Sequence, residues 1–264
     1  MNNPEDQSLL NHPVKLKREF YTQSLFKVTK ELLGKIIIKT ENTSVVYLQM
    51  TSIQRNSIRT KLPCSLNIGQ HPASQNPVTD NKQMSDNVIL QHLLTSGTFL
   101  AGKIVEVEAY DGNIDQAAHT FIGRTKRNEI MFNQGGYLYV YFTYGIHFCA
   151  NVVTGKEGRG TAVLIRAVQP LFGIEQMIRN RYHRDLKNEK EKLNLTNGPG
   201  KICQAFGINK DHYGADLTGN QIFIIDQPKV HNKNIIVTKR IGITKSVDLL
   251  WRFYIKDNPW VSSK

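Results

Sequence analysis

Cysteine is scarce in this chain of 264 residues. The three cysteines, Cys64, Cys149 and Cys203, are odd in number, lie far apart and form no C-x-x-C pair. This pattern argues against a disulfide framework and against a cysteine zinc site, and it indicates a reducing compartment. We therefore expect the protein to work inside the cell.

Long apolar runs are also missing. No stretch approaches the ~20 apolar residues that a membrane-spanning helix needs. The first segment, "MNNPEDQSLLNHPVKLKREF", contains no apolar signal-peptide core. We therefore expect neither membrane insertion nor secretion.

Negative charge is under-represented. The chain has 34 Lys and Arg against 22 Asp and Glu, a formal net charge of +12. An excess of positive charge favours polyanionic partners, namely DNA, RNA or an anionic membrane surface. Charge alone fits an ordinary basic protein equally well, so other evidence must decide.

One long segment lacks a sustained hydrophobic period. Residues 41–98 are polar and rich in Asn, Ser, Gln and Thr. This composition predicts a loop-like or disordered insertion, whose ends "SVVYLQM" and "VILQHLL" fit a strand and a helical turn. Its basic residues barely outnumber its acidic ones, so nearly all the excess positive charge belongs to the rest of the chain.

The remaining sequence mixes strands and helices without a regular strand–helix–strand alternation. Helices are expected at 24–33, capped by Ser24, at 171–182, and from about Pro199. Strands are expected at 35–40, 102–110, 138–142, 144–153, 161–170, 221–226, 234–243 and 251–255. The arrangement predicts a single α+β domain over 15–264, after a tail at 1–14 and interrupted by the insertion.

Two glutamates mark a candidate for acid–base chemistry. Ile104, Glu106, Glu108 and Tyr110 alternate onto one face of the expected strand 102–110. Three interpretations remain open: a solvated strand face, a metal site that adds Asp111 and Asp115, or a metal-free hydrolase in which one glutamate activates water. Spacing does not rank the last two.

A glycine-bracketed helix start offers a second, weaker signal. The segment "NGPGKI" (197–202) lacks the spacing of a P-loop. Lys201 and the free backbone N–H groups there are still suited to a phosphate. The basic stretch at 179–187 is more typical of a solvated helix face.

Tyrosines crowd the segment "GGYLYVYFTYG" (135–145). Tyr137, Tyr139 and Tyr141 alternate onto one face, while Leu138, Val140 and Phe142 take the opposite, core face. Gly145 predicts a turn, which places Tyr144 near the tip of a β-hairpin. One face made of tyrosine favours a surface that stacks on nucleic-acid bases.

Five motifs recur in the order found in the alkyladenine (3-methyladenine) DNA glycosylase family, which this chain resembles. They are "VEVEAYDGNIDQAAHTFIGRTKRNEIMF", "YLYVYFTYGIHFCANVV", "VLIRAVQP", "GPGKICQAFGI" and "RFYIKDNPWVS". The resemblance runs from about Gly102 to Trp260, with a weaker stretch at 15–39. It implies an α+β fold with a curved antiparallel sheet, surrounding helices and a protruding hairpin that enters the DNA minor groove.

The resemblance also implies residue roles. Glu108 resembles the general base that activates water, and Arg166 resembles the side chain that helps to hold that water. The aromatic walls around the flipped base are matched by Tyr110, His119 and Tyr141.

Other matches concern selectivity and DNA contact. Asn151 resembles the gate that disfavours the exocyclic amine of guanine, and Tyr144 resembles the hairpin residue that fills the gap in the duplex. Lys201 is assigned to DNA contact from its position at the expected helix start. The segment "KRIGITK" (239–245) resembles one that lines the pocket, although its "ITK" departs from the family pattern.

The sequence thus predicts a monofunctional DNA glycosylase that flips and hydrolyses alkylated or deaminated purines in base excision repair. We expect double-stranded DNA carrying damaged purines as the partner, a monomer, no cofactor and no metal. The alternatives are a metal-dependent nuclease that uses the acidic cluster and an inactive nucleic-acid-binding module. The expected location is with the DNA, in the cytoplasm of a bacterium or the nucleus of a eukaryote.

Overall fold

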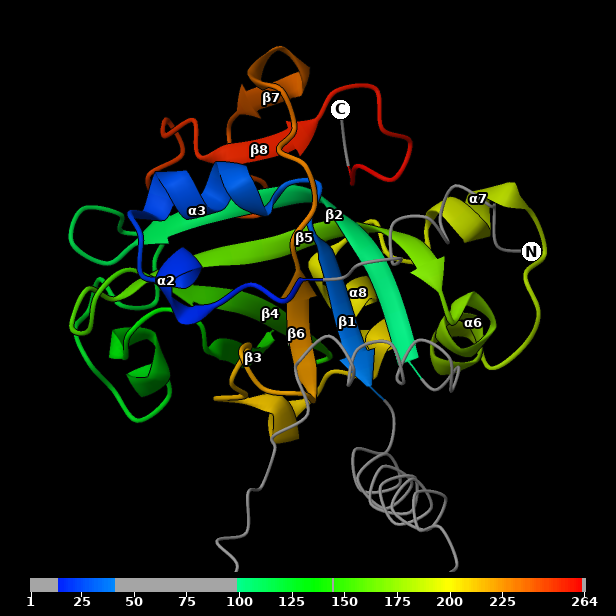
Figure 1. Cartoon of the computed structure of the whole chain (residues 1–264), viewed down its shortest axis with the longest axis horizontal. Coiled ribbons are helices and arrows are strands. Elements are labelled where there is room, and N and C mark those ends of the chain that lie inside the picture. The colour runs from blue at the N-terminus through cyan, green and yellow to red at the C-terminus, as the bar shows by residue number, and fades with distance from the viewer. Residues whose placement is uncertain (1–13, 41–98, 144, 263–264) are drawn as a thin grey trace, which may run out of the picture.

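An antiparallel sheet forms the centre of the computed structural model, which describes residues 14–40, 99–143 and 145–262. Eight strands form the sheet: six run in the order β3-β4-β5-β2-β1-β6, and β8 joins β2 and β7 beside this path. The strands are β1 (Ile36–Thr40), β2 (Phe99–Asp111), β3 (Leu138–Thr143), β4 (His147–Thr154), β5 (Thr161–Phe172), β6 (Ile222–Ile225), β7 (Ile235–Thr238) and β8 (Arg252–Ile255). Figure 1 shows the curved sheet and the short β7–β8 pair beyond it, which confirms the expected α+β class.

Helices pack against this sheet. They are α2 (Arg18–Tyr21), α3 (Leu25–Leu32), α6 (Ile174–Tyr182), α7 (Glu189–Leu193) and α8 (Pro199–Phe206), with 3-10 turns η1 (Glu129–Phe132), η2 (Lys210–His212) and η3 (Asn232–Asn234). Ser24 and Pro199 stand at the expected helix starts, although the Ser24 side chain makes no capping bond. In Figure 1, α2 and α3 lie in front of the strands and α8 lies behind them.

The longest strand, β2, does not keep its expected alternation. Ile104 pairs with Val168, but Glu106 pairs with its neighbour Ala167, so Val105 is an extra residue on β2. A bulge of this kind shifts the side chains that follow it. Ile104 therefore packs in the main core, and the expectation that it shares a face with Glu106 was wrong.

A second irregularity faces this bulge. Glu106 pairs with Ala167 and Val107 pairs with Ile165, so Arg166 is an extra residue on β5. Bulges re-aim side chains next to functional sites. Here the irregularity places Arg166 beside the two glutamates of β2.

The hairpin of β3 and β4 matches the expected pattern at its base and departs from it near its tip. Tyr139 packs with Tyr137 and Tyr141 in one cluster, while Leu138 and Val140 join the main core. Phe142 was expected on the core face but is 49% exposed, because the strand has passed the core; its ring lies 4.9 Å from that of Phe148.

The turn between β3 and β4 forms the tip of the hairpin. Thr143 pairs with His147, so the hairpin turns between these two residues. Tyr144, the expected tip residue, lies outside the described residues.

The insertion at 41–98 also lies outside the described residues, but its two attachment points are clear. Thr40 at the end of β1 and Phe99 at the start of β2 are direct antiparallel partners. The insertion therefore begins and ends at one place on the sheet. Among the described residues, no helix is long and apolar enough to cross a membrane.

Candidate active site

A cavity of about 450 Å³ opens at the end of the sheet where the tyrosine hairpin lies. Its volume falls within the range of small-molecule sites. Side chains from β2, β3, β4 and β5 line it. Residues from the segment between β2 and β3, from the start of α8 and from the loop after β7 complete the lining. The lining residues are Tyr110, Gln116, Ala117, His119, Met131, Tyr139, Tyr141, Thr143, Cys149, Asn151, Leu164, Arg166, Pro199 and residues 241–245.

Glu108 is fully buried and does not itself line the cavity, but it is bonded to Tyr110 and Ile241, which do. Its Oε2 accepts a hydrogen bond from the Tyr110 hydroxyl at 2.9 Å, and its Oε1 accepts one from the backbone N–H of Ile241 at 2.8 Å. Burial raises the pKa of Glu108, while the positive charge of Arg166 opposes that rise. The carboxyl is thus held in one orientation with an increased affinity for a proton, which suits a general base.

Glu106 is equally buried but has a different set of partners. Its Oε1 accepts hydrogen bonds from Arg252 Nε at 2.6 Å and from Ser262 Oγ at 2.9 Å, and its Oε2 accepts one from the backbone N–H of Ser262. Neither Arg252 nor Ser262 lines the cavity, whereas both hydrogen-bond donors of Glu108 do. These bonds make Glu106 a structural anchor for the C-terminal segment.

Arg166 connects the two carboxylates. Its Nε lies 3.1 Å from Glu106 Oε1 and 3.5 Å from Glu108 Oε1. The angles are too poor for a hydrogen bond at Nε, so the contact is one of charge. Since Arg166 lines the cavity, its guanidinium is placed to contact a molecule bound there.

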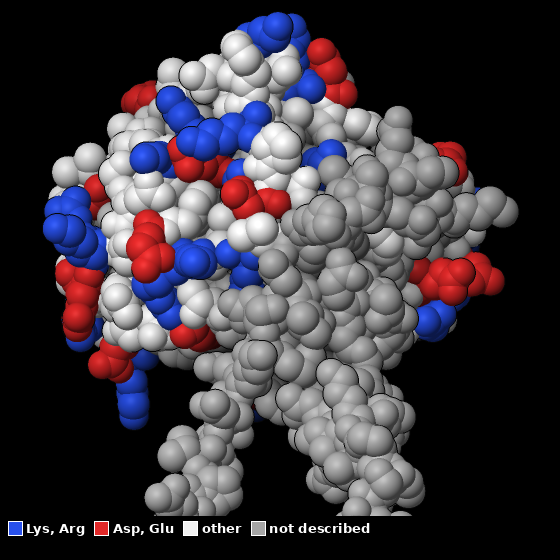
Figure 2. Space-filling model, viewed as in Figure 1, with Lys and Arg blue, Asp and Glu red and all other residues white. Residues whose placement is uncertain are grey.

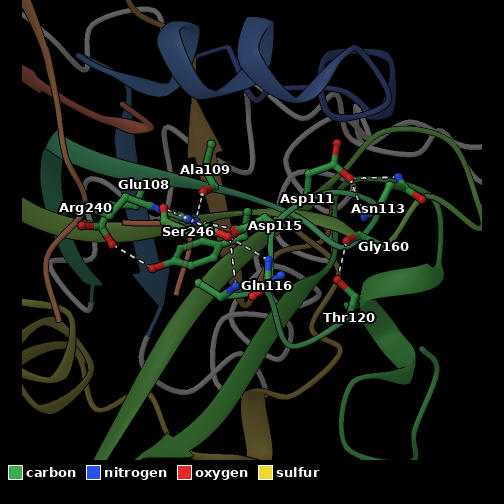
Figure 3. Close-up of polar contacts among 12 residues, drawn as sticks. Glu108, Ala109, Asp111, Asn113, Asp115, Gln116, Thr120, Gly160, Arg240 and Ser246 are labelled. Carbon is green, nitrogen blue, oxygen red and sulfur yellow. Dashed lines mark hydrogen bonds and ion pairs between the residues drawn. The ribbon is translucent and has the colours of Figure 1, made fainter. Parts of the chain in front are cut away.

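An ion pair that sequence reasoning missed positions the loop after β7. Arg240 and Asp115 are fully buried and joined by two hydrogen bonds, at 2.5 and 2.7 Å. Arg240 also donates to the carbonyl of Ala109, and its guanidinium lies 4.6 Å from the centre of the Tyr110 ring. Figure 3 shows Glu108, Asp115 and Arg240 converging from three segments of the chain.

This loop had been expected to continue as strand to residue 243. The strand ends at Thr238 instead, and residues 241–245 line the cavity. Arg240 bonds to Asp115 and to the carbonyl of Ala109 there, so the chain leaves β8 after Thr238 and turns toward the end of β2. The departure of "ITK" from the family pattern does not remove the segment from the cavity.

The acidic cluster separates into different structural roles. Asp111 accepts bonds from the backbone and side chain of Asn113 in a turn, and Asp115 is engaged by Arg240. Across residues 14–40, 99–143 and 145–262, no three His, Cys, Asp or Glu side chains gather where they could hold a metal ion.

An aromatic group forms one wall of the cavity. Tyr139 and Tyr141 are stacked with 5.4 Å between ring centres, and His119 meets Tyr141 edge-on at 4.5 Å. The Tyr139 hydroxyl lies 2.9 Å from His119 Nδ1. Burial lowers the pKa of His119 and raises that of Tyr139 to about 12, so both groups are neutral near pH 7.

Two small side chains complete the floor. Asn151 is buried, and its amide nitrogen donates to the carbonyl of Tyr139 at 3.3 Å. Cys149 lies beside Tyr141, and burial raises the pKa of its thiol. The neutral thiol makes a weak nucleophile.

Lys201 occupies the first turn of α8, near the cavity wall formed by Pro199. Its ammonium donates to the side-chain oxygens of Asn194 at 2.9 Å and Asn197 at 2.7 Å. Two of its three N–H donors are thereby used within the protein. Its assignment to DNA contact stays a prediction.

Comparisons with known proteins identify the chain. The family described as "Methylpurine-DNA glycosylase (MPG)" matches residues 78–259, so the match begins inside the insertion rather than at Gly102. A protein of Clostridium novyi is 37% identical over 256 residues, which cover 95% of this chain and 99% of that protein.

Another relative, from Alkaliphilus oremlandii, is 49% identical over 174 residues, or 64% of this chain and 86% of that protein. A third, from Francisella tularensis, is 45% identical over 182 residues, or 67% and 91%. All three carry the name "Putative 3-methyladenine DNA glycosylase". The chain therefore belongs to the methylpurine-DNA glycosylase family.

Proposed function

We propose that the cavity receives a damaged purine flipped out of DNA and that Glu108 activates the water that releases it. Family membership makes the chain a DNA glycosylase of the 3-methyladenine type, an N-glycosyl hydrolase of base excision repair. The proposal concerns which residues divide that work. The observation that carries it is a buried carboxylate directly behind an aromatic cavity, held by hydrogen bonds from two residues that line it, Tyr110 and Ile241.

In the proposed reaction, a water molecule lies between Glu108 and the sugar. Its oxygen bonds to C1′ while the bond from C1′ to the purine nitrogen breaks, and the purine leaves with that electron pair. Glu108 takes a proton from the water, and Arg166 donates hydrogen bonds that hold the water in place. The products are a free base and an abasic sugar, and the DNA backbone stays intact.

The aromatic wall would hold the flipped base. Stacking on Tyr141 and His119 offsets the cost of unstacking the base from the duplex, which is a few kcal/mol. Some alkylated purines carry a formal positive charge, and tyrosine faces attract cations. Tyr110 supports this wall and fixes Glu108 through its hydroxyl.

Selection among purines is assigned to Asn151. Its side chain forms part of the cavity floor beside the Tyr139 carbonyl, where it is buried and cannot swing aside freely. An exocyclic amine on the purine would meet the Asn151 amide there. This contact would disfavour guanine relative to adenine-derived lesions.

DNA contact outside the cavity is assigned to Tyr144 and Lys201. Tyr144 would occupy the space that the flipped nucleotide leaves in the duplex. Lys201 would offer its remaining N–H to a phosphate. The protein would act on the duplex as a monomer.

A direct assay tests the proposed function. Duplexes that carry hypoxanthine, ethenoadenine or 3-methyladenine are incubated with the protein and then treated with alkali, which cleaves abasic sites. We expect cleavage only after alkali, with or without EDTA. Strand cleavage without alkali that EDTA abolishes would indicate a metal-dependent nuclease, and binding without any base release would indicate an inactive binding module.

A further inference from the structure

A loop beside the cavity exposes apolar and basic side chains together. All seven residues of the 121–127 loop, "FIGRTKR", are exposed. Ile122 is 79% exposed, the highest value among the large hydrophobic side chains of the described residues, and Phe121 is 42% exposed. Neighbouring exposed apolar side chains rimmed by polar residues mark interaction sites.

The loop is held in a defined conformation. The buried side chain of Asn128 donates to the carbonyls of His119 and Gly123 at 2.8 and 2.9 Å. The same side chain accepts a bond from the backbone N–H of Thr125 at 2.7 Å. The apolar tip is therefore presented by a braced loop, which lowers the entropy lost on binding.

The loop also lies next to the hairpin. Arg127 donates to the carbonyl of Phe142 at 3.1 Å, and its guanidinium lies 5.7 Å from the centre of the Tyr141 ring. His119, which lines the cavity, comes two residues before the loop. The 121–127 loop and the hairpin thus border the cavity from two segments.

Positive charge accompanies the apolar tip. Arg124, Lys126 and Arg127 lie within four positions, and none of them has an acidic partner within ion-pair distance among the described residues. Glu129 is the nearest acid along the sequence. Figure 2 shows Lys and Arg interspersed with Asp and Glu on the described part of the face seen in Figure 1.

We propose that the 121–127 loop is a second DNA-binding element, beside the hairpin, whose cations contact phosphates while Phe121 and Ile122 enter a groove of the substrate duplex. Apolar side chains flanked by cations are typical of proteins that wedge open a base step. The partner is duplex DNA, because the loop borders the cavity that receives its base. This inference rests on the proposed function.

Two double variants of the full chain separate the two contributions. Phe121→Ser with Ile122→Ser removes the apolar tip, and its control is Val237→Ser on β7, where the side chain is 46% exposed. Arg124→Ala with Lys126→Ala removes two cations, and its control is Lys187→Ala with Lys190→Ala near α7, where both side chains are exposed. Affinity is measured by fluorescence anisotropy on an undamaged duplex and on the matching single strand, so the measurement does not depend on excision.

We expect the apolar variant to weaken duplex binding about tenfold, with less effect on the single strand and no change in salt dependence. The charge variant should reduce the slope of log Kd against log salt by about 2. Unfolding midpoints check that each variant is folded, and the charge variant carries the test if the apolar variant is unstable.

Unchanged duplex affinity in both double variants, or losses equally large in the two controls, would overturn the inference. Failure of the proposed function would be seen separately, as an absence of base excision by the wild-type protein.

Discussion

The backbone N–H of Ile241 donates to Glu108 Oε1 at 2.8 Å, which joins the loop after β7 to the last part of β2 across 133 positions of sequence. The neighbouring Arg240 is fixed by Asp115, so the loop that lines the cavity also orients the proposed base. Glu108 is held by fixed donors on both oxygens. Its geometry therefore depends also on Asp115 and Arg240, which do not line the cavity.

Breaking the buried ion pair should cost both stability and activity. Asp115→Asn leaves the charge of Arg240 buried without its partner, and such losses cost about 3–5 kcal/mol in the free energy of unfolding. Urea denaturation measures this cost, and single-turnover excision should slow because the Ile241 bond to Glu108 is disturbed. Lys239→Ala removes an exposed ion pair with Asp248 one residue away and should change stability little. Equal effects of the two substitutions would contradict this account.

The pKa of Glu108 predicts a specific pH dependence of stability. Burial raises this pKa in the folded protein, so the folded state binds the proton more tightly than the unfolded chain does. The stabilising contribution of the protonated carboxyl is complete below the unfolded pKa and is lost as pH rises through the folded pKa. Glu108→Gln, which mimics the protonated form, should therefore gain stability relative to the wild type as pH rises toward neutral. A difference that does not vary with pH would show that Glu108 is ionised as easily in the folded state as in the unfolded chain.

The pH dependence of the excision rate should also report the ionisation of Glu108. A general base works only when ionised, so the single-turnover rate should rise with pH and level off above the raised pKa of Glu108. Its midpoint should lie above ~4.3, the ordinary value for glutamate. A rate that is flat through this range would remove Glu108 as the base.

The stacked tyrosines should differ in their effect on selectivity. Tyr141→Ala removes a cavity wall and should slow excision and weaken the discrimination between damaged and normal purines. Tyr141→Phe retains the ring and serves as the control. Competition between lesion and undamaged duplexes measures the discrimination. If both variants discriminate as well as the wild type, the tyrosine face is only packing.

The insertion should be dispensable for folding and excision. Thr40 and Phe99 are direct partners on β1 and β2, so a short flexible linker spans the gap when residues 45–95 are removed. We expect a soluble protein whose single-turnover rate matches that of the full chain. Insoluble protein, or soluble protein without excision, would show that the removed residues contribute to the core or to the site.

Local patterns in the sequence predicted much of the fold. Alternation and apolar runs located the strands, and the phase of Tyr137, Tyr139 and Tyr141 was confirmed by their shared cluster. The bulge at Val105 could not be anticipated, because an extra residue in a strand depends on the register with its partner strand. Phe142 is exposed because the hairpin extends past the core, which alternation does not reveal.

The residues of the site were likewise predicted in part and missed in part. Motif resemblance brought together five residues that the structure places around one cavity: Tyr110, His119, Tyr141, Asn151 and Arg166. The pairing of Asp115 with Arg240 was missed, because 125 positions separate them and neither residue lies in a local pattern that demands the other. The sequence offered one weak signal. Asp115 follows the end of a strand and Arg240 lies in the segment 239–245, which resembles a pocket-lining one, and a charged residue at either place needs a partner if it is buried.

The most direct test of the account compares Glu108→Gln with the wild type in single-turnover excision of ethenoadenine from a duplex, with duplex affinity measured in parallel. The account predicts that affinity is retained and that the rate falls by at least ~100-fold, because glutamine cannot take a proton from water. Glu106→Gln, which alters the anchor of Arg252 and Ser262, should reduce the rate less. Excision by Glu108→Gln near the wild-type rate would contradict the assignment of Glu108 as the general base.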